Sequence, residues 1–510
     1  MFLTKIINHP TILILNLNLA SMALIFMISG KTNAQEKIIL NEPMLIEMIE
    51  KNSPDVKMLE AINMASQIEV EKSENQFKAE IFARKSVEET SQKPIIQFQP
   101  VFTPIHQNLL GVRQNFRKGI GLQAYGSTDQ RNANSPFAGK FENVTTNTFA
   151  VGVTVDLWKD FWGKLTSTQL ESIELQKEKN KLENVIAKKQ INLNLRRIYW
   201  SLVANNESLL ISQELLKTAE SQAKEAQRRL NASIADEGEL ASYQAQVASR
   251  KGNILYLQYQ REQLIKQLRS MIPDLQTKSI ELTGYNLEQS ISEVLACTHL
   301  ISQQEKTPFD YTQYDEVISM LNKVKNGQIK IAESYDQMDL KLSGEVKATG
   351  VSSEKDGNKS LYEGSHQDAM EDIYDNTRSG YKIGLDLVIP FGKSSTKDSL
   401  QIYEENKSTA QLDKMMSNIK STHQQLATSV VLLTEVIKTQ KENNLALEKR
   451  LKIMNRKFRE ARVNTFELIQ DQDALMSSSL TVIQTKLEIV NTLLDYLVIF
   501  NQTPCEFNKI

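Results

Sequence analysis

The sequence is poor in the side chains from which catalytic and metal sites are usually built. It contains two cysteines, Cys297 and Cys505, and five isolated histidines without the spacing of metal ligands. No glycine-rich phosphate loop, nucleophile elbow or Cys/His arrangement occurs in it. The formal net charge of −2 leaves no basic surface for nucleic acid. We therefore expect no enzyme, catalytic residue, metal or cofactor, while a disulfide between the two cysteines stays open.

Helix-breaking residues are missing from two long stretches. Proline is absent from residues 137–272 and 391–503, and glycine is absent after Gly392. Because proline and glycine interrupt helices, their absence over a hundred residues permits unusually long ones. At 1.5 Å per residue, long helices over residues 164–233 and 394–462 would each span about 100 Å.

Apolar residues in these stretches follow the spacing of a coiled coil. Leu202, Leu209 and Leu216 lie seven residues apart, and Leu447 and Met454 repeat this step later in the chain. A seven-residue repeat keeps one stripe of a helix facing a partner. We expect each long helix to be followed by a return helix, over residues 238–271 and 465–502.

Immediately before each long helix the period changes from 3.5 to 2. Apolar and polar residues alternate over about 147–157 and 379–389, and their earlier partners lie at about 119–128 and 338–350. Each run is about as long as a tilted strand that crosses a bilayer with lipid-facing and lumen-facing side chains in alternation. The pattern predicts a transmembrane β-barrel part with four strands per chain. The alternative is an ordinary two-sided sheet in a soluble domain.

Aromatic residues stand where these strands end. Trp158 and Trp162 follow the second strand, and Phe391 follows the fourth. Tryptophan and other aromatic side chains favour the boundary between membrane and water. We expect interfacial aromatics here, although packing at a strand–helix junction is compatible with the same pattern.

The first residues have the features of a secretory signal peptide. Lys5 provides positive charge, residues 11–27 are mostly apolar, and Thr32, Asn33 and Ala34 offer a small-residue cleavage site. We expect residues 1–34 to be this signal, with an uncleaved anchor helix as the alternative. No other run of eighteen apolar residues occurs, so we expect no ordinary transmembrane helix in the remainder.

The order helix, two strands, long helix, return helix occurs twice. Residues 35–290 form the first repeat, and residues 291–510 form the second, which opens with a helix over 309–337. Residues 81–118 and 273–307 fit the repeat poorly. We expect the first of these to be irregular, because it holds three prolines, and the second to form a girdle around the helices.

The turns between long and return helices align with each other and carry a resemblance. Residues 229–240 match residues 457–468, and in each an acidic residue precedes leucine, six positions after a small residue. In its element order, spacing and tips the chain resembles the TolC-like outer-membrane factor family. It departs from the family pattern at the tip glycines, here Ser233 and Ala461, and at the tip aspartates, here Glu239 and Glu467.

The resemblance implies a quaternary structure and partners. Four strands cannot close a barrel alone, and an open edge in lipid would leave backbone groups unpaired. Two chains would supply eight strands and three would supply twelve; the family implies the homotrimer, continued by a periplasmic coiled-coil tunnel. The implied function is the exit duct of a tripartite efflux or type I secretion system in the outer membrane of a Gram-negative-type bacterium. The implied partners are a periplasmic adaptor protein, an inner-membrane transporter and outer-membrane lipid.

The resemblance also implies roles for residues at the tips. Adaptor contact would fall on Ala232, Ser233, Ile234, Glu460, Ala461 and Arg462, and the pore constriction on Glu467, Gln470 and Asp471. An ion pair between Glu239 and Arg462 would hold the two hairpins together. For each of these residues an ordinary exposed helix turn or surface acid is the plainer alternative. For the whole chain the alternative is a periplasmic coiled-coil adaptor or scaffold protein without a membrane barrel.

Overall fold

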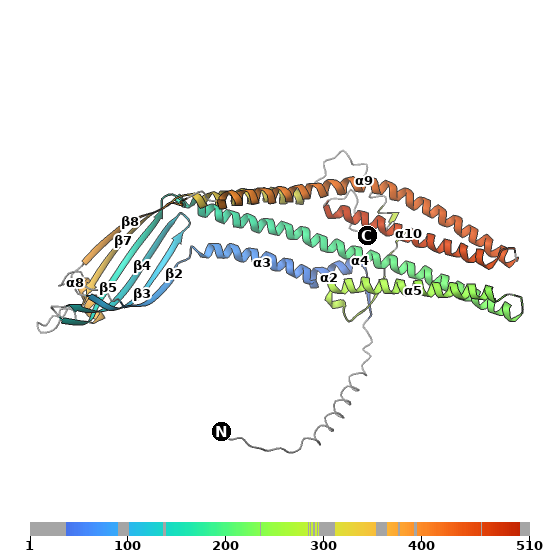
Figure 1. Cartoon of the computed structure of the whole chain (residues 1–510), viewed down its shortest axis with the longest axis horizontal. Coiled ribbons are helices and arrows are strands. Elements are labelled where there is room, and N and C mark those ends of the chain that lie inside the picture. The colour runs from blue at the N-terminus through green and yellow to red at the C-terminus, as the bar shows by residue number, and fades with distance from the viewer. Residues whose placement is uncertain are drawn as a thin grey trace, which may run out of the picture.

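A computed structural model gives the structure of the chain. It describes residues 37–89, 101–135, 139–234, 236–283, 285, 287–288, 291–292, 294, 312–352, 365–375, 378–391, 395–460 and 462–499. The molecule is elongated, with a β-sheet at one end and the turns of two helical hairpins at the other (Figure 1). The expected signal peptide, both cysteines and the expected tip residue Ala461 lie outside the described residues.

The sheet contains six antiparallel strands in the order β2-β3-β4-β5-β7-β8. Their bounds are Glu80–Glu88, Val101–Phe116, Ile120–Ser135, Gly139–Asp156, Asp339–Val351 and Arg378–Val388. The last four correspond to the expected strands, whereas β2 and β3 lie where an irregular segment was expected. That expectation is wrong, and the number of strands per chain in this sheet is six rather than four.

The prolines between residues 81 and 118 explain why the strands β2 and β3 are not predicted from the sequence. Pro104 lies inside β3, where the pairing with β4 shifts register between Phe102 and Ile105. Proline has no N–H to donate, so strands tolerate it only at edges, at ends or at such irregularities. Beyond it, the pairing of β3 with β4 continues without interruption to Phe116 opposite Ile120.

The helices form two hairpins. The first joins α4 (Lys164–Asn231) to α5 (Glu237–Met271), and the second joins α9 (Ser395–Arg459) to α10 (Thr465–Ile499). With 68 residues in α4 and 65 in α9, each long helix extends about 100 Å at 1.5 Å per residue. These bounds differ from the expected ones by at most three residues at each end.

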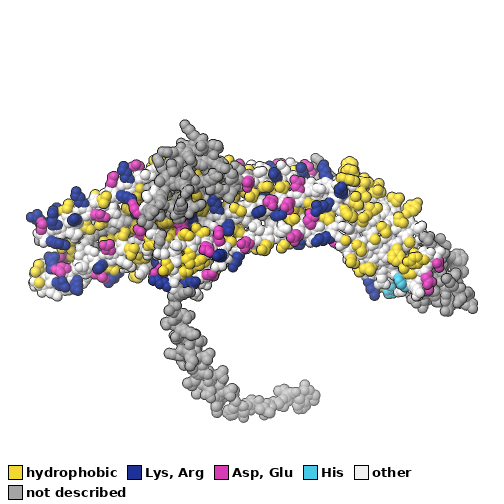
Figure 2. Space-filling model, turned by 180° about the vertical axis from the view of Figure 1, so that it is seen from behind, with side chains coloured by type: hydrophobic (Ala, Val, Ile, Leu, Met, Phe, Trp, Pro, Cys, Tyr) yellow, Lys and Arg dark blue, Asp and Glu magenta, His cyan; other side chains and the backbone are white. Residues whose placement is uncertain are grey.

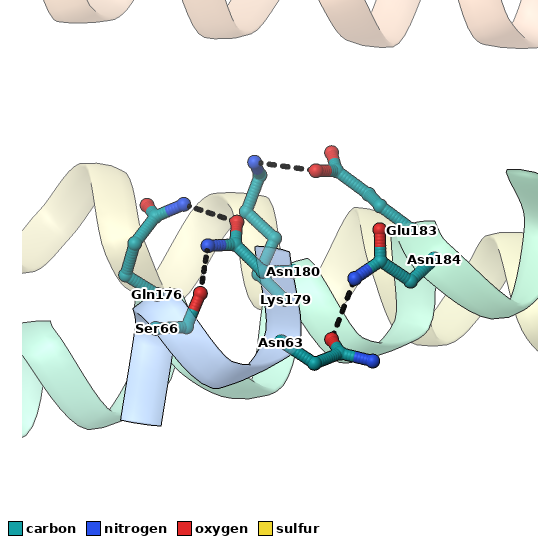
Figure 3. A network of polar contacts seen from close by, with 7 residues as sticks. All are labelled: Asn63, Ser66, Gln176, Lys179, Asn180, Glu183 and Asn184. Carbon is teal, nitrogen blue, oxygen red and sulfur yellow. Dashed lines mark hydrogen bonds and ion pairs between the residues drawn. The ribbon is translucent and has the colours of Figure 1, made fainter. Parts of the chain in front are cut away.

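Shorter helices line the half of α4 nearest the sheet. They are α3 (Pro54–Asn75) and α7 (Thr312–Glu333), and α3 contacts α4 through amide and hydroxyl groups (Figure 3). Asn180 donates to Ser66 at 2.8 Å, and Asn184 donates to Asn63 at 2.5 Å. Side-chain hydrogen bonds of this kind fix the register of two helices whose contact face holds few apolar residues.

A compact apolar core lies halfway along the helices. The short strands β1 (Lys37–Leu40) and β6 (Ser279–Leu282) pair in parallel beside α2 (Glu42–Asn52), and Leu40, Leu268 and Leu275 are fully buried there. This core joins elements from both halves of the chain, because it also contains Leu493 and Tyr496 of α10. Among the described helices, none is at once long and apolar enough to cross a membrane.

Candidate channel wall and hairpin tips

One face of the sheet is apolar across all six strands. Successive strand pairings align the side chains of one row, which runs Ile81, Val112, Ala124, Val151, Val346 and Tyr381. Ile81 is 79% exposed and Tyr381 is 80% exposed. The neighbouring rows on this face add Leu110, Phe149, Leu122, Val153, Ile383 and Leu385. Figure 2 shows hydrophobic side chains gathered over this end of the molecule.

The opposite face carries polar and charged side chains. Glu80 pairs with Arg113 at 2.8 Å, and Tyr125 donates to Glu345 at 3.2 Å. Small residues of this face, such as Ala150 at 3% exposure, are buried by their neighbours, whereas the apolar side chains stand out in solvent. Crowding on one face and exposure on the other are expected of a sheet curved around its polar side, as in the wall of a barrel.

The aromatic residues expected at a membrane boundary lie at the helical end of the sheet. Trp158 and Trp162 are 55% and 63% exposed, and Phe391 is fully exposed. The turn that carries the tryptophans requires left-handed backbone at Trp162 and Gly163. A Cβ on Gly163 would lie 1.9 Å from the carbonyl oxygen of Arg117, so only glycine fits there.

The tip of the first hairpin is a helix end closed by two backbone hydrogen bonds. The Ile234 N–H donates to the Arg229 carbonyl at 2.8 Å, and the Ser233 N–H donates to the Leu230 carbonyl at 2.9 Å. This is the Schellman arrangement, which requires left-handed backbone at its penultimate position. Ser233 adopts it with φ 58°, although glycine would do so without steric cost.

The second tip repeats the first. The Arg462 N–H donates to the Lys457 carbonyl at 2.9 Å, the equivalent of the bond between Ile234 and Arg229. Each return helix is then capped by a side chain: Asp236 accepts from the Glu239 N–H at 2.7 Å, and Asn464 accepts from the Glu467 N–H at 2.8 Å.

The expected tip residues are exposed, but the expected constriction residues differ among themselves. Ala232, Ser233, Ile234, Glu460 and Arg462 are all exposed at the turns. Glu467 and Gln470 are exposed as well, whereas Asp471 is 3% exposed and pairs with Arg450 of α9 at 2.7 Å. Asp471 is therefore neutralised inside its own hairpin.

The expected ion pair between Glu239 and Arg462 does not form. Glu239 pairs with Arg229 at 2.8 Å, and Arg462 pairs with Glu460 at 3.3 Å. Each of these pairs lies within a single hairpin. Because the guanidinium of Arg229 lies 5.9 Å from the ring centre of Phe458, a cation–π contact joins the tips instead.

Buried polar contacts hold the two hairpins together close to the tips. Gln246 of α5 donates to Gln472 of α10 at 2.9 Å, and Arg250, itself 4% exposed, pairs with Asp473. Tyr243 is buried beside Thr465, and burial raises the pKa of its hydroxyl. These contacts are not predicted from the sequence, in which their one signal is Arg250 among the small and amide residues of α5.

Within the part of the chain that the structure describes, no group of three His, Cys, Asp or Glu side chains is placed to hold a metal ion. At the tips, a groove of about 520 Å³ is lined by Arg229, Glu239, Phe458, Phe466 and their neighbours.

Comparison with known proteins places the fold. No protein-family model matches the sequence, and no curated protein matches it. Among solved structures, the outer membrane protein VceC from Vibrio cholerae is similar, with a TM-score of 0.61 and 14% identity over 89% of this chain and 95% of that one. The outer membrane channel CmeC of Campylobacter jejuni has a TM-score of 0.61 and 11% identity, over 92% of this chain and 90% of that one. The open state of the outer membrane channel MtrE of Neisseria gonorrhoeae has a TM-score of 0.56 and 13% identity, over 92% and 93%. The fold of this chain is that of the TolC-like outer-membrane factors.

Proposed function

We propose that the chain is one protomer of an outer-membrane channel that serves as the exit duct of an efflux system. The observation that carries the proposal is the sheet, apolar on one face and polar on the other across six strands, which continues directly into hairpins about 100 Å long. A sheet of this kind is stable in lipid when its apolar face points outward and its edges are paired. The solved structures that it resembles are outer-membrane channels.

The protomer functions as a homotrimer. Among the described strands of one copy, β2 and β8 each pair along one edge alone, and an unpaired edge is costly in hydrocarbon. Three copies arranged about one axis pair these edges and bring their long helices together as a tunnel across the periplasm. Solutes pass through it without chemical change.

The tips are the point at which partners open the duct. Ala232, Ser233, Ile234, Glu460, Ala461 and Arg462 form the contact surface for a periplasmic adaptor protein, which links the duct to an inner-membrane transporter in a tripartite efflux or type I secretion system. Glu467 and Gln470 face the constriction in the closed state. The division of the chain into repeats 35–290 and 291–510 places one tip in each repeat.

The test is the membrane fraction and oligomeric state of the full chain expressed in a Gram-negative host. We expect it in the outer membrane, extracted only by detergent, as a trimer that resists SDS until heated. In planar bilayers the purified protein conducts ions. Release by a periplasmic wash as a monomer without conductance would overturn the proposal and favour a coiled-coil adaptor or scaffold.

A further inference from the structure

We propose that the β2–β3 hairpin is part of the barrel wall, so that β2 of one copy pairs with β8 of the next and a trimer closes with eighteen strands. The proposal rests on the channel function above and determines the width of its outlet. Both open edges of the sheet are then covered by further copies of this chain, one on each side.

The hairpin has the same two faces as the strands beside it. Ile81, Leu110 and Val112 are 79%, 62% and 45% exposed on the apolar face, in rows that continue through β4, β5, β7 and β8. On the polar face, Glu80 pairs with Arg113. A hairpin lying inside the lumen or outside the wall would place one of these faces in the wrong environment.

The directions of the two edge strands suit closure. Neighbouring strands are antiparallel throughout the sheet, so β2 runs away from the helices and β8 runs back toward them. Placed side by side, the two edges would therefore pair in the antiparallel sense that every other pair shows. They are also of similar length, with 9 residues in β2 and 11 in β8.

The stagger of the strands sets the register. Along the row that joins Ile81 to Tyr381, β2 begins one residue on the helical side, at Glu80, whereas β8 extends seven residues further, to Val388. In a barrel, the helical ends of all strands lie at the same height along the barrel axis. The β2 strand of the next copy must therefore be shifted along β8 by about seven or eight residues from this row, so that its helical end lies beside that of β8. With apolar side chains kept outward, residue 81 of the next copy then lies opposite residue 389, eight residues from Tyr381.

Charges on the polar face select the same register. It places Arg84 of β2 opposite Asp386 of β8, and Glu88 opposite Lys382. All four side chains are exposed, and none forms an ion pair with another described residue of its own chain. Opposite charges directly across two strands stabilise the pairing, and a shift by two residues would lose both matches.

The geometry agrees with that of membrane barrels. An offset of eight residues per copy shifts the register by about 26 Å along the strands. The six strands of one copy are together about 29 Å wide. The ratio of the two lengths corresponds to a strand tilt of about 42° from the barrel axis, within the range of about 35–45° that membrane barrels have. Eighteen strands at this tilt give a backbone diameter of about 37 Å, against about 25 Å for twelve. Barrels of this size leave an open aqueous lumen, so the outlet does not restrict the solute and selection falls to the tips.

Disulfide cross-linking in native outer membranes tests the closure. With Cys297 and Cys505 replaced by Ser, we combine Ala83→Cys with Leu387→Cys, which the register places opposite each other on the apolar face. Oxidation is expected to yield covalent dimers and trimers. Within one chain the two positions lie on opposite edges of the sheet, so an intramolecular bond cannot account for the bands.

The competing pair is Ala124→Cys with Leu385→Cys or Leu387→Cys, which joins β4 to β8 as a twelve-stranded barrel would. Covalent trimers from this pair, and none from Ala83→Cys with Leu387→Cys, would overturn the proposal and leave the channel function standing. Absence of cross-links from every pair, in a protein released by a periplasmic wash, would overturn both.

Charge reversal gives an independent reading. Arg84→Asp should lower the temperature at which the SDS-resistant trimer dissociates, and adding Asp386→Arg should restore it. Lys347→Asp is the matched control, because β7 has neighbours on both sides within its own chain. An equal shift from Arg84→Asp and Lys347→Asp, with no rescue by Asp386→Arg, would count against the pairing of β2 with β8.

Discussion

Ser233 occupies a position that favours glycine. Its backbone is left-handed, with φ 58°, and a residue with a Cβ adopts this conformation at a cost of about 1 kcal/mol relative to glycine. We expect Ser233→Gly to slow hydrogen exchange at the Ile234 amide about fivefold, because that amide reports opening of the turn. Ser233→Val should accelerate exchange, since a β-branched side chain suits this backbone poorly. Unchanged exchange in both variants would show that the turn is not limited by the residue at its left-handed position.

A second prediction at the residue scale concerns Glu288. Its carboxylate accepts from Lys441 of α9 and Lys486 of α10, and these hydrogen bonds hold its pKa below the ordinary range. A lowered pKa means that the pairing contributes stability above the unfolded pKa and loses it as pH falls through the folded value. Hydrogen exchange of residues 287, 288, 291, 292 and 294 should therefore be faster in Glu288→Gln at neutral pH and equal to wild type in acid.

The matched control for that measurement is Glu281→Gln, which removes one exposed ion pair, at 2.7 Å, with Lys37 of β1 rather than with a residue of either hairpin. It should leave the exchange of those five residues unchanged at every pH. If Glu288→Gln behaved like this control, the ionic contact would have no part in holding the segment against α9 and α10.

At the scale of elements, the junction between sheet and first hairpin depends on one glycine. A Cβ at Gly163 would overlap the Arg117 carbonyl, and the backbone there has φ +74°. We expect Gly163→Ala to destabilise the fold by about 2–4 kcal/mol and to lower the amount of trimer in the membrane. Gly252→Ala is the control: nothing lies within 4 Å of a Cβ there, and in the α5 interior alanine should add about 1 kcal/mol. Equal trimer yields from both would contradict the steric argument.

The elements differ in how far the sequence alone could place them. Long helices without proline or glycine, and strands with clean alternation, are strong local signals, so α4, α9, β7 and β8 lie close to the expected ranges. The strands β4 and β5 match at the helical end of the sheet but extend beyond the expected ranges at the other end, to Ser135 and from Gly139. The strand β3 contains Pro104, and because proline is disfavoured inside strands, the local sequence does not predict a strand there. Its pairing with β4 over the rest of its length is a long-range contact, which no local sequence pattern reveals.

At the hairpin tips, too, the sequence predicts only part of the structure. The return helix is expected to begin at residue 238, whereas α5 begins at Glu237 after its cap Asp236 and contains Gly238 in its first turn. Asp471 and Glu467 are both acids near one turn, but only Glu467 is exposed. Spacing along a helix shows which residues share a face, not which face another hairpin covers.

At the scale of the whole molecule, the proposed channel function implies that the contact between the hairpins sets the resting state of the duct. Arg250 is buried, and its partner Asp473 comes from the other hairpin. Replacing Asp473 by Asn leaves a buried guanidinium without its counter-charge, which is costly enough to separate the helices that bury it. We expect Asp473→Asn to raise single-channel conductance and to make cells sensitive to large antibiotics that the closed duct excludes.

A double variant separates the effect of the unpaired charge on Arg250 from a general loss of packing. Adding Arg250→Met to Asp473→Asn removes the unpaired charge while keeping an unbranched side chain in the same place, so conductance should return toward wild type. Glu239→Gln serves as the control, because Glu239 pairs with Arg229 within its own hairpin and its loss does not separate the two. Increased conductance in Glu239→Gln, or no recovery in the double variant, would show that the pair between α5 and α10 does not hold the tips closed.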